Sequence, residues 1–286
     1  MYHRLTGSVA LTAALALGCG TPAEQTQQED YTERMAKEHA QDAPVAGAAS
    51  MKANDANPRE MTTREVSYAT IDGQAVKGYL AAPQGGSKAA VIVIHEWWGL
   101  NDNIRTMAEK LAGQGYMALA IDLYGGQVAT TPQEAKAIMS TAMQSPKKGQ
   151  ENIQQAHAWL MGEGAQRVGS IGWCFGGGWS LQTALMGRSD ATVIYYGRLV
   201  TEEEKLSTLK TPILGIFGAE DQGIPVKSVK AFEATLKKLG KPHAIHVYEG
   251  ANHAFANPSG HRYKPDAAQD AWGKTLAFLD KHLNQP

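Results

Sequence analysis

The sequence predicts a doubly wound α/β fold, in which helices flank a mostly parallel sheet. Two observations lead to this prediction. From Arg64 onward, β-branched segments alternate with segments of helical periodicity. Ala89–Ile94 is apolar at every position, as in a parallel strand that is buried on both faces. We find no internal repeat in the sequence and expect one catalytic domain over residues 61–286.

The first elements of this domain are two strands joined by a tight turn. Val66–Ile71 and Val76–Ala81 flank Asp72-Gly73, a dipeptide that favours a two-residue hairpin. The strands that we expect after them are Ala89–Ile94, Tyr116–Ile121, Arg167–Gly172, Thr192–Tyr196, Pro212–Phe217 and Ala244–Tyr248. The expected helices are Asn103–Gly113, Pro132–Met143, Gly149–Met161, Phe175–Met186, Pro225–Leu239 and Ala267–His282.

Residues 1–19 have the proportions of a signal peptide. A short basic stretch precedes the apolar run Leu5–Leu17, which is too short for a stable bilayer anchor. The run continues into Gly18-Cys19, which resembles a bacterial lipoprotein signal whose cysteine is lipidated after cleavage. We therefore expect a lipid anchor at Cys19 and a location in the bacterial cell envelope, facing the periplasm or the outer surface. The alternatives are a plain secretory signal cut near Gly20 and a start codon placed too early.

Residues 20–60 are expected to form a flexible linker. They are rich in Gln, Glu, Asp, Ala, Thr and Pro, with almost no large apolar side chains. Such a stretch cannot offset its ordering entropy by burial. Glu29–Gln41 has helical spacing, but its apolar face is thin.

Charge and cysteine content exclude several classes of protein. The chain has 27 Lys and Arg against 28 Asp and Glu, a formal net charge of −1. This balance disfavours binding to nucleic acid or to an anionic membrane surface, so membrane contact is expected only through the lipid anchor. The two cysteines, Cys19 and Cys174, are too few for a disulfide framework and too widely spaced for a zinc knuckle.

Cys174 is the candidate nucleophile. Gly172-Trp173-Cys174-Phe175-Gly176-Gly177 lies between a predicted strand and a predicted helix, with glycines two residues before and after the cysteine. This is the G-x-S-x-G elbow pattern with sulfur in place of oxygen. A position at a helix N-terminus favours the thiolate. The alternative is that a lone cysteine is a small buried hydrophobic residue.

A histidine and a carboxylate follow the nucleophile in the expected order. Asp221, or its neighbour Glu220, follows a predicted buried strand, and His253 follows the last strand. The order nucleophile, acid, histidine is that of the α/β-hydrolase fold. Taken singly, His253 could be a loop histidine without a role and Asp221 a turn or capping residue.

The motif His95-Glu96-Trp97-Trp98-Gly99 follows the third strand, where such folds supply an oxyanion-hole N–H. It differs from the zinc motif H-E-x-x-H because Gly99 replaces the second histidine and because it ends a strand. We therefore expect neither a metal nor a cofactor.

Five motifs together carry a resemblance to a known family. H-E-W-W-G-L-N, D-L-Y-G-G, G-W-C-F-G-G, G-A-E-D-Q-G-I-P and G-A-N-H-A-F, in this order and spacing, resemble the dienelactone hydrolase family from about Tyr68 to the C-terminus. The resemblance implies a triad of Cys174, His253 and Asp221, with Glu96 as a carboxylate that accepts the proton of the resting thiol. It also implies oxyanion donors at the backbone N–H groups of Phe175 and Trp97. Otherwise Glu96 is a capping carboxylate or is paired with Arg105, and Trp97 is a core or wall residue.

One position departs from the family pattern. Members that hydrolyse dienelactone carry an arginine four residues after the histidine, where this chain has Asn257, and Arg262 is near but not equivalent. We expect a hydrolase of activated esters, enol lactones or thioesters acting through a thioester acyl-enzyme. The alternatives are a non-catalytic, envelope-tethered binding protein that retains the fold, and a redox-sensing thiol protein, which would usually need a second cysteine.

Overall fold

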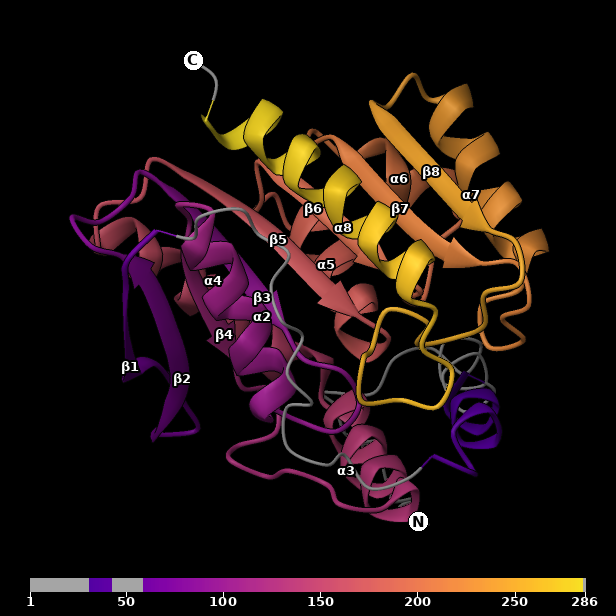
Figure 1. The fold of residues 1–286 in the computed structure, drawn as a ribbon, viewed down its shortest axis with the longest axis horizontal. Helices are drawn as coiled ribbons and strands as arrows, with labels where there is room; N and C mark the ends of the chain where they lie inside the picture. The colour runs from indigo at the N-terminus through magenta and orange to yellow at the C-terminus, as the bar shows by residue number, and fades with distance from the viewer. Residues whose placement is uncertain (1–30, 43–58, 285–286) are drawn as a thin grey trace, which may run out of the picture.

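The computed structural model describes residues 31–42 and 59–284 of the chain. The predicted signal segment with Cys19 lies outside these residues. So do residues 20–30 and 43–58 of the expected linker. The described residues contain one eight-stranded sheet of order β1-β2-β4-β3-β5-β6-β7-β8 (Figure 1). None of the helices found there is long and apolar enough to cross a membrane.

The first two strands form the predicted hairpin. β1 (Met61–Ile71) pairs with β2 (Gln74–Pro83) in antiparallel register. Asp72 and Gly73 between them have φ angles of 50° and 76°, the left-handed backbone that a two-residue hairpin turn requires. β2 then pairs antiparallel with β4, which joins the hairpin to the edge of the main sheet.

The remaining strands are parallel to one another, which confirms the expected doubly wound architecture. They are β3 (Ala89–Ile94), β4 (Met117–Ile121), β5 (Arg167–Trp173), β6 (Ala191–Tyr195), β7 (Ile213–Gly218) and β8 (His243–Tyr248). β3, β4, β6 and β7 are buried at every position because helices cover both faces of the sheet.

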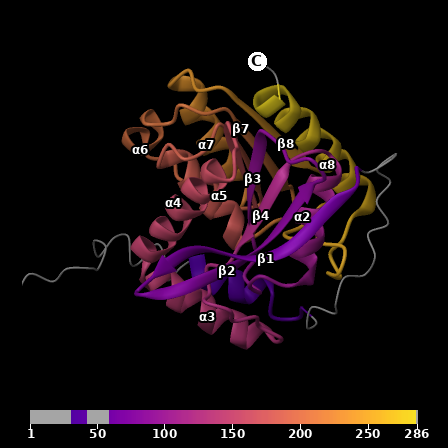
Figure 2. The ribbon, with the colours of Figure 1, turned by 90° about the vertical axis from the view of Figure 1, so that its left-hand side faces the viewer.

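The helices lie in two layers. α2 and α8 lie on one side of the sheet, whereas α4, α5, α6 and α7 lie on the other (Figure 2). The bounds are α2 (Asp102–Gly113), α3 (Pro132–Gln144), α4 (Pro146–Gly162), α5 (Phe175–Leu185), α6 (Glu203–Ser207), α7 (Val226–Lys238) and α8 (Pro265–Leu279), followed by the π-helix η1 (Asp280–Asn284). The short helix α6 and the π-helix were not predicted, since neither has enough length for a periodic pattern.

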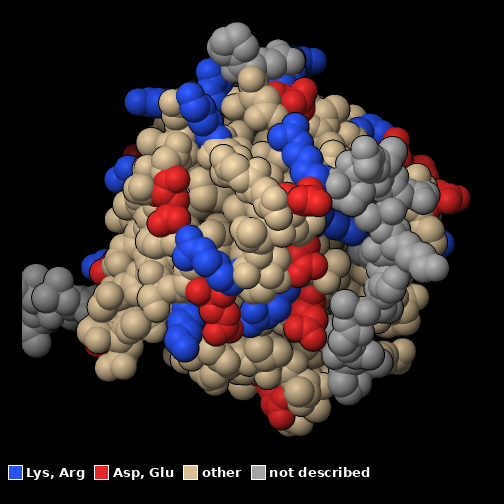
Figure 3. Space-filling model, turned by 60° about the vertical axis from the view of Figure 1, so that its left-hand side comes forward, with Lys and Arg blue, Asp and Glu red and all other residues tan. Residues whose placement is uncertain are grey.

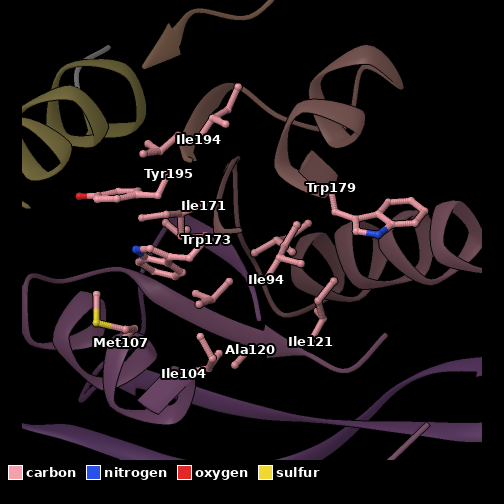
Figure 4. Close-up of a cluster of buried hydrophobic side chains, with 14 of the residues drawn as sticks. Ile94, Ile104, Met107, Ala120, Ile121, Ile171, Trp173, Trp179, Ile194 and Tyr195 are labelled. Carbon is pink, nitrogen blue, oxygen red and sulfur yellow. The ribbon is translucent and has the colours of Figure 1, made fainter. Parts of the chain in front are cut away.

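Large side chains fill the space between the sheet and its helices (Figure 4). Trp173 and Tyr195 pack side by side on neighbouring strands, with ring centroids 5.5 Å apart. Ile104 and Met107 of α2 approach the core from one helix layer and Trp179 of α5 approaches it from the other. This core fixes the positions at which the strands end.

Residues 31–42, which fall within the expected linker, pack against the domain instead. We call them the N-terminal segment; residues 31–38 are helical. Tyr31, Met35 and His39 lie four residues apart and are only 2%, 0% and 2% exposed. This is the thin apolar stripe of the Glu29–Gln41 pattern, and the domain buries it. A Cβ atom added at Gly223 would lie 1.9 Å from the Met35 Cε atom, so the end of the Met35 side chain packs directly on this glycine.

The surface is mixed in charge. On the face shown in Figure 3, blue and red side chains are interspersed, and no single-sign patch is visible. Arg64 and Glu163 form one exposed ion pair at 2.9 Å, and Lys136 pairs with Glu33 of the N-terminal segment at 2.7 Å.

Candidate active site

The site lies at the carboxyl-terminal edge of the parallel sheet, where doubly wound folds place their ligands. Glu96, Cys174, Asp221 and His253 follow β3, β5, β7 and β8, respectively. The fold therefore brings together residues that are far apart in the sequence.

Cys174 occupies a strained turn between β5 and α5. Its φ angle is 54°, an unusual value for a residue with a side chain. The turn is possible because its neighbours are glycines: a Cβ at Gly172 would lie 2.1 Å from the Gly176 oxygen, and one at Gly176 would lie 2.3 Å from the Ile94 oxygen. The Cys174 N–H donates to the Tyr195 carbonyl at 3.0 Å. This is the elbow that the glycine spacing predicts.

His253 and Asp221 form a buried pair. His253 Nδ1 lies 2.7 Å from Asp221 Oδ2, and both side chains are fully buried. Asp221 also accepts the Ile224 N–H at 2.8 Å, which fixes the carboxylate. Glu220, the other candidate from the sequence, is exposed. A ring nitrogen of His253 also lies within 4.8 Å of Cys174 Sγ. Because Nδ1 faces Asp221, the nitrogen left for the sulfur is Nε2.

A second histidine, which sequence reasoning missed, also reaches the thiol. His39 Nε2 lies 3.8 Å from Cys174 Sγ. Its Nδ1 faces the Asp42 carboxylate at 2.5 Å, and its ring lies 4.3 Å from that of Trp97. Only the spacing of Tyr31, Met35 and His39 indicates from the sequence that this histidine is buried.

The buried groups change one another's ionisation. Burial opposes ionisation of the Cys174 thiol, but the His253 and His39 imidazoles outweigh it and lower its pKa to about 6. Burial likewise opposes a charge on His253, yet the Asp221 carboxylate and the Cys174 sulfur raise its pKa well above the ordinary value. The arrangement therefore favours a thiolate beside an imidazolium at neutral pH.

The loop after β3 is held by His95. Its Nδ1 lies 2.6 Å from the Glu96 carbonyl, and its Nε2 lies 3.1 Å from the Leu123 backbone nitrogen. An Nδ1 that donates and an Nε2 that accepts describe a neutral imidazole, and burial lowers the His95 pKa in agreement. His95 thus positions the loop that carries Glu96 and Trp97.

Two backbone N–H groups are candidate donors to an oxyanion. Phe175 is the first residue of α5, and its N–H group bonds to no acceptor within residues 31–42 and 59–284. The N–H group of Trp97 likewise has no acceptor in the described part of the chain. Unpaired N–H groups at a helix start and a strand end are available to an anion.

The model of the dienelactone hydrolase family matches residues 76–283. The chain belongs to this family. A Saccharolobus solfataricus protein named "Putative carboxymethylenebutenolidase" is 34% identical, over 76% of this chain and 97% of its own. Protein usf of Aquifex pyrophilus is 32% identical, over 74% and 96%. The crystal structure of a dienelactone hydrolase from Klebsiella pneumoniae, itself titled putative, aligns with a TM-score of 0.69 and 27% identity, covering 78% of this chain and all of that one.

Membership of the dienelactone hydrolase family makes this chain a carboxylic ester or lactone hydrolase. The match begins after the N-terminal segment, so His39 and Asp42 lie outside the region matched to the family model. The motifs quoted for the family from the sequence all lie inside it.

Asn257, which stands at the family's arginine position, binds Glu96. Its Nδ2 donates to Glu96 Oε2 at 2.6 Å. Burial, and then the negative charge of Cys174, raise the pKa of Glu96 to about 7. The pairing with Arg105 considered from the sequence is not formed: within the described residues Arg105 pairs with Glu65 at 3.4 Å.

Arg262 holds the N-terminal segment in place. Its guanidinium donates to the Glu38 carbonyl at 2.6 Å and to the Asp42 carboxylate at 3.0 Å. A small cleft lined by Asp42, Asn257 and Arg262 reaches Glu96 and His39. Cys174 and His253 do not line this cleft, and both are fully buried beside the segment.

Proposed function

We propose that this protein hydrolyses activated carboxylic esters, enol lactones and thioesters, with Cys174 as nucleophile, His253 as acid and base, and Asp221 as the residue that orients His253. One observation carries the proposal: His253 bonds Asp221 through Nδ1 and turns Nε2 towards a sulfur held on a strained elbow. This is the relation between the groups of a nucleophile, base and acid triad.

In the first half of the reaction the Cys174 thiolate attacks the substrate carbonyl and forms a carbon–sulfur bond. The N–H groups of Phe175 and Trp97 donate to the oxyanion that develops. The intermediate then collapses, and the His253 imidazolium gives its Nε2 proton to the leaving group. The products of this half are a thioester on Cys174 and a free enol, phenol or thiol.

In the second half, neutral His253 takes a proton from a water molecule that attacks the thioester. The carbon–sulfur bond breaks, and Cys174 leaves as a thiolate beside a renewed imidazolium. Asp221 keeps the imidazole in the required tautomer throughout, since Nδ1 is committed to its carboxylate.

Glu96 is proposed to accept the Cys174 proton whenever the nucleophile is in its thiol form, since the carboxyl pKa of about 7 lies above the thiol pKa of about 6. A carboxyl group with a pKa of about 7 can hold or release a proton near neutral pH. Asn257 donates to the carboxylate and so favours its ionised form.

The thiol limits the range of substrates. A tetrahedral intermediate expels the weaker base, and ordinary pKa values are about 8.5 for a thiol, about 10 for a phenol and about 15.7 for water, which stands in for an alcohol. A Cys174 pKa of about 6 makes the thiolate a still better leaving group. Against a phenolate or an enolate the difference in pKa is about 4 units, which the proton that His253 gives to the leaving group can offset. Against an alkoxide it is about 10 units, so the thiolate leaves first, and simple alkyl esters and amides are expected to be poor substrates.

The proposal is tested with a panel of enol, aryl, thio and alkyl esters on the full chain, with the Cys174→Ala variant beside it. We expect turnover of the first three classes, little turnover of alkyl esters, and none in the variant. Most of the activity surviving in Cys174→Ala would contradict the assignment of the nucleophile. If the wild-type chain turned over none of these esters, the alternative of a non-catalytic binding protein that retains the fold would be favoured.

We also propose that the domain is held at the cell envelope through a lipid on Cys19, as the first 19 residues indicate. Detergent phase partitioning of the expressed chain tests this location. The wild type should enter the detergent phase and Cys19→Ala should stay in the aqueous phase, whereas equal partitioning would argue against lipidation.

A further inference from the structure

Three metal-binding atoms from distant parts of the chain meet at the nucleophile. His39, Cys174 and His253 each offer one ligand atom, and these atoms all lie within 4.8 Å of one another. All three residues are buried, at 2%, 0% and 0% exposure. We propose that they form a binding site for a soft divalent cation such as Zn²⁺, and that the bound cation blocks the nucleophile and links the N-terminal segment to the domain.

The orientation of the two imidazoles favours metal binding. His253 directs Nδ1 to the Asp221 carboxylate at 2.7 Å, and His39 directs Nδ1 to the Asp42 carboxylate at 2.5 Å. In zinc sites a ligating histidine commonly donates its other ring N–H to a carboxylate, which fixes the tautomer and makes the ligand more basic. The two carboxylates therefore hold Nδ1 of each imidazole and leave Nε2 for a cation, which binds once it displaces the proton that an imidazolium carries there.

The surroundings of His253 Nε2 also favour a bound cation. His253 Nε2 is inaccessible to solvent and has no hydrogen-bond partner within the described residues. An unsatisfied buried polar atom is costly, so such an atom needs an explanation. Its neighbours in the cluster are Cys174 Sγ and His39 Nε2, and a cation between the three would satisfy it.

The chemistry of the donors selects the kind of cation. One thiolate and two imidazoles suit Zn²⁺ and other soft or borderline cations, whereas Mg²⁺ and Ca²⁺ prefer oxygen ligands. Zinc lies about 2.3 Å from sulfur and about 2.0 Å from nitrogen, so in a tetrahedron its ligand atoms are roughly 3.3 to 3.6 Å apart. The sulfur and His39 Nε2 are already 3.8 Å apart, so small side-chain rotations complete the site.

A cation bound at this site would inhibit catalysis because it occupies two of the proposed catalytic atoms. The cation takes the sulfur lone pair that attacks substrate and the His253 Nε2 atom that moves protons. It also ties His39, and with it the N-terminal segment, to the elbow. The inference rests on the placement of three atoms and not on turnover, and its residues are distinct from the H-E-x-x-H pattern considered from the sequence.

The test is metal binding to the full chain, purified without a histidine tag. Calorimetry with Zn²⁺ is expected to give one equivalent, and Co²⁺ in its place is expected to give a thiolate-to-cobalt charge-transfer band. Cys174→Ser should abolish the band. His39→Gln, which keeps a similar side-chain volume but offers no imidazole, should weaken Zn²⁺ binding by at least about tenfold, the lower bound for loss of even an outer-shell partner.

The matched control is His157→Gln, which removes a half-buried histidine on α4 and should leave Zn²⁺ binding unchanged. Circular dichroism of each variant shows whether it has folded. Absence of stoichiometric Zn²⁺ binding by the wild type would overturn the proposal, and so would equal affinities for wild type and His39→Gln. Ester turnover is measured separately, so loss of the proposed catalytic role would leave the metal result standing, and the reverse also holds.

Discussion

His39 Nε2 lies 3.8 Å from Cys174 Sγ, although 135 positions separate the two residues in the chain. His39 belongs to the N-terminal segment, which precedes the residues matched to the dienelactone hydrolase family. Cys174 therefore lies between two imidazole–carboxylate pairs, one from the domain and one from this segment. Variants of each pair can separate their effects on the Cys174 thiol.

The first prediction concerns the ionisation of Cys174. Because the pKa of its thiol is lowered to about 6, the thiolate persists at neutral pH and is lost as the pH falls through 6. The measurement is the ultraviolet thiolate absorbance against pH, with the Cys174→Ser spectrum subtracted. A midpoint near the ordinary thiol value of about 8.5 would contradict the inferred ion pair.

Glu96 should shift that midpoint. The charge of Cys174 raises the pKa of Glu96, and the effect is reciprocal, so an ionised Glu96 disfavours the thiolate. Glu96→Gln is isosteric but uncharged and is expected to lower the midpoint of the same titration only slightly, since a carboxyl with a pKa of about 7 is ionised in about one molecule in ten at pH 6. Glu163→Gln, which alters only an exposed ion pair with Arg64, is the control and should leave it unchanged. A higher midpoint in Glu96→Gln would argue against the proposed proximity of charge.

Asp221 and Glu220 can be separated by matched variants. Asp221→Asn retains the shape of the side chain but removes the charge that holds His253, and loss of the corresponding aspartate in a serine triad costs about 10⁴-fold in kcat. We expect a loss of at least about 10²-fold on an aryl ester. Glu220→Gln changes an exposed neighbour and should retain wild-type kcat. Similar activity in the two variants would rule out Asp221 as the orienting residue.

The N-terminal segment should shield the thiol. Met35 is fully buried against Gly223, so Met35→Asp places a carboxylate where its desolvation is costly and should release the segment. We expect iodoacetamide to modify Cys174 at least about tenfold faster in this variant, as followed by peptide mass spectrometry. Lys37→Asp introduces the same side chain at an exposed position of the segment and should react like the wild type. Equal rates of modification in the two variants would show that Met35 does not hold the N-terminal segment over Cys174.

Local sequence patterns predicted most of the fold. The strands β3 to β8 have the predicted bounds to within one residue at each end, because burial along most of these strands leaves apolar runs in the sequence. The turn at Asp72-Gly73 and the elbow around Cys174 were predictable because both need glycine at fixed positions. Because Cys174, Asp221 and His253 each follow a predicted strand, the sequence also predicted that they meet at one edge of the sheet.

Contacts between distant segments were not predictable. The stripe of Tyr31, Met35 and His39 is too narrow to distinguish a docked helix from a solvated one, since the surface that buries it is built from other parts of the chain. The partner of Glu96 was missed for the same reason: Asn257 follows it by 161 positions. A sequence pattern reports which face of an element is apolar but not which surface covers that face.

Trapping of the acyl-enzyme tests the central claim most directly. Acid quenching of the wild type during turnover of an aryl ester, followed by peptide mass spectrometry, should show the acyl mass on the peptide that carries Cys174. The Cys174→Ala chain should show neither adduct nor turnover. Turnover by the wild type with no adduct on Cys174, or an adduct on another residue, would contradict the account.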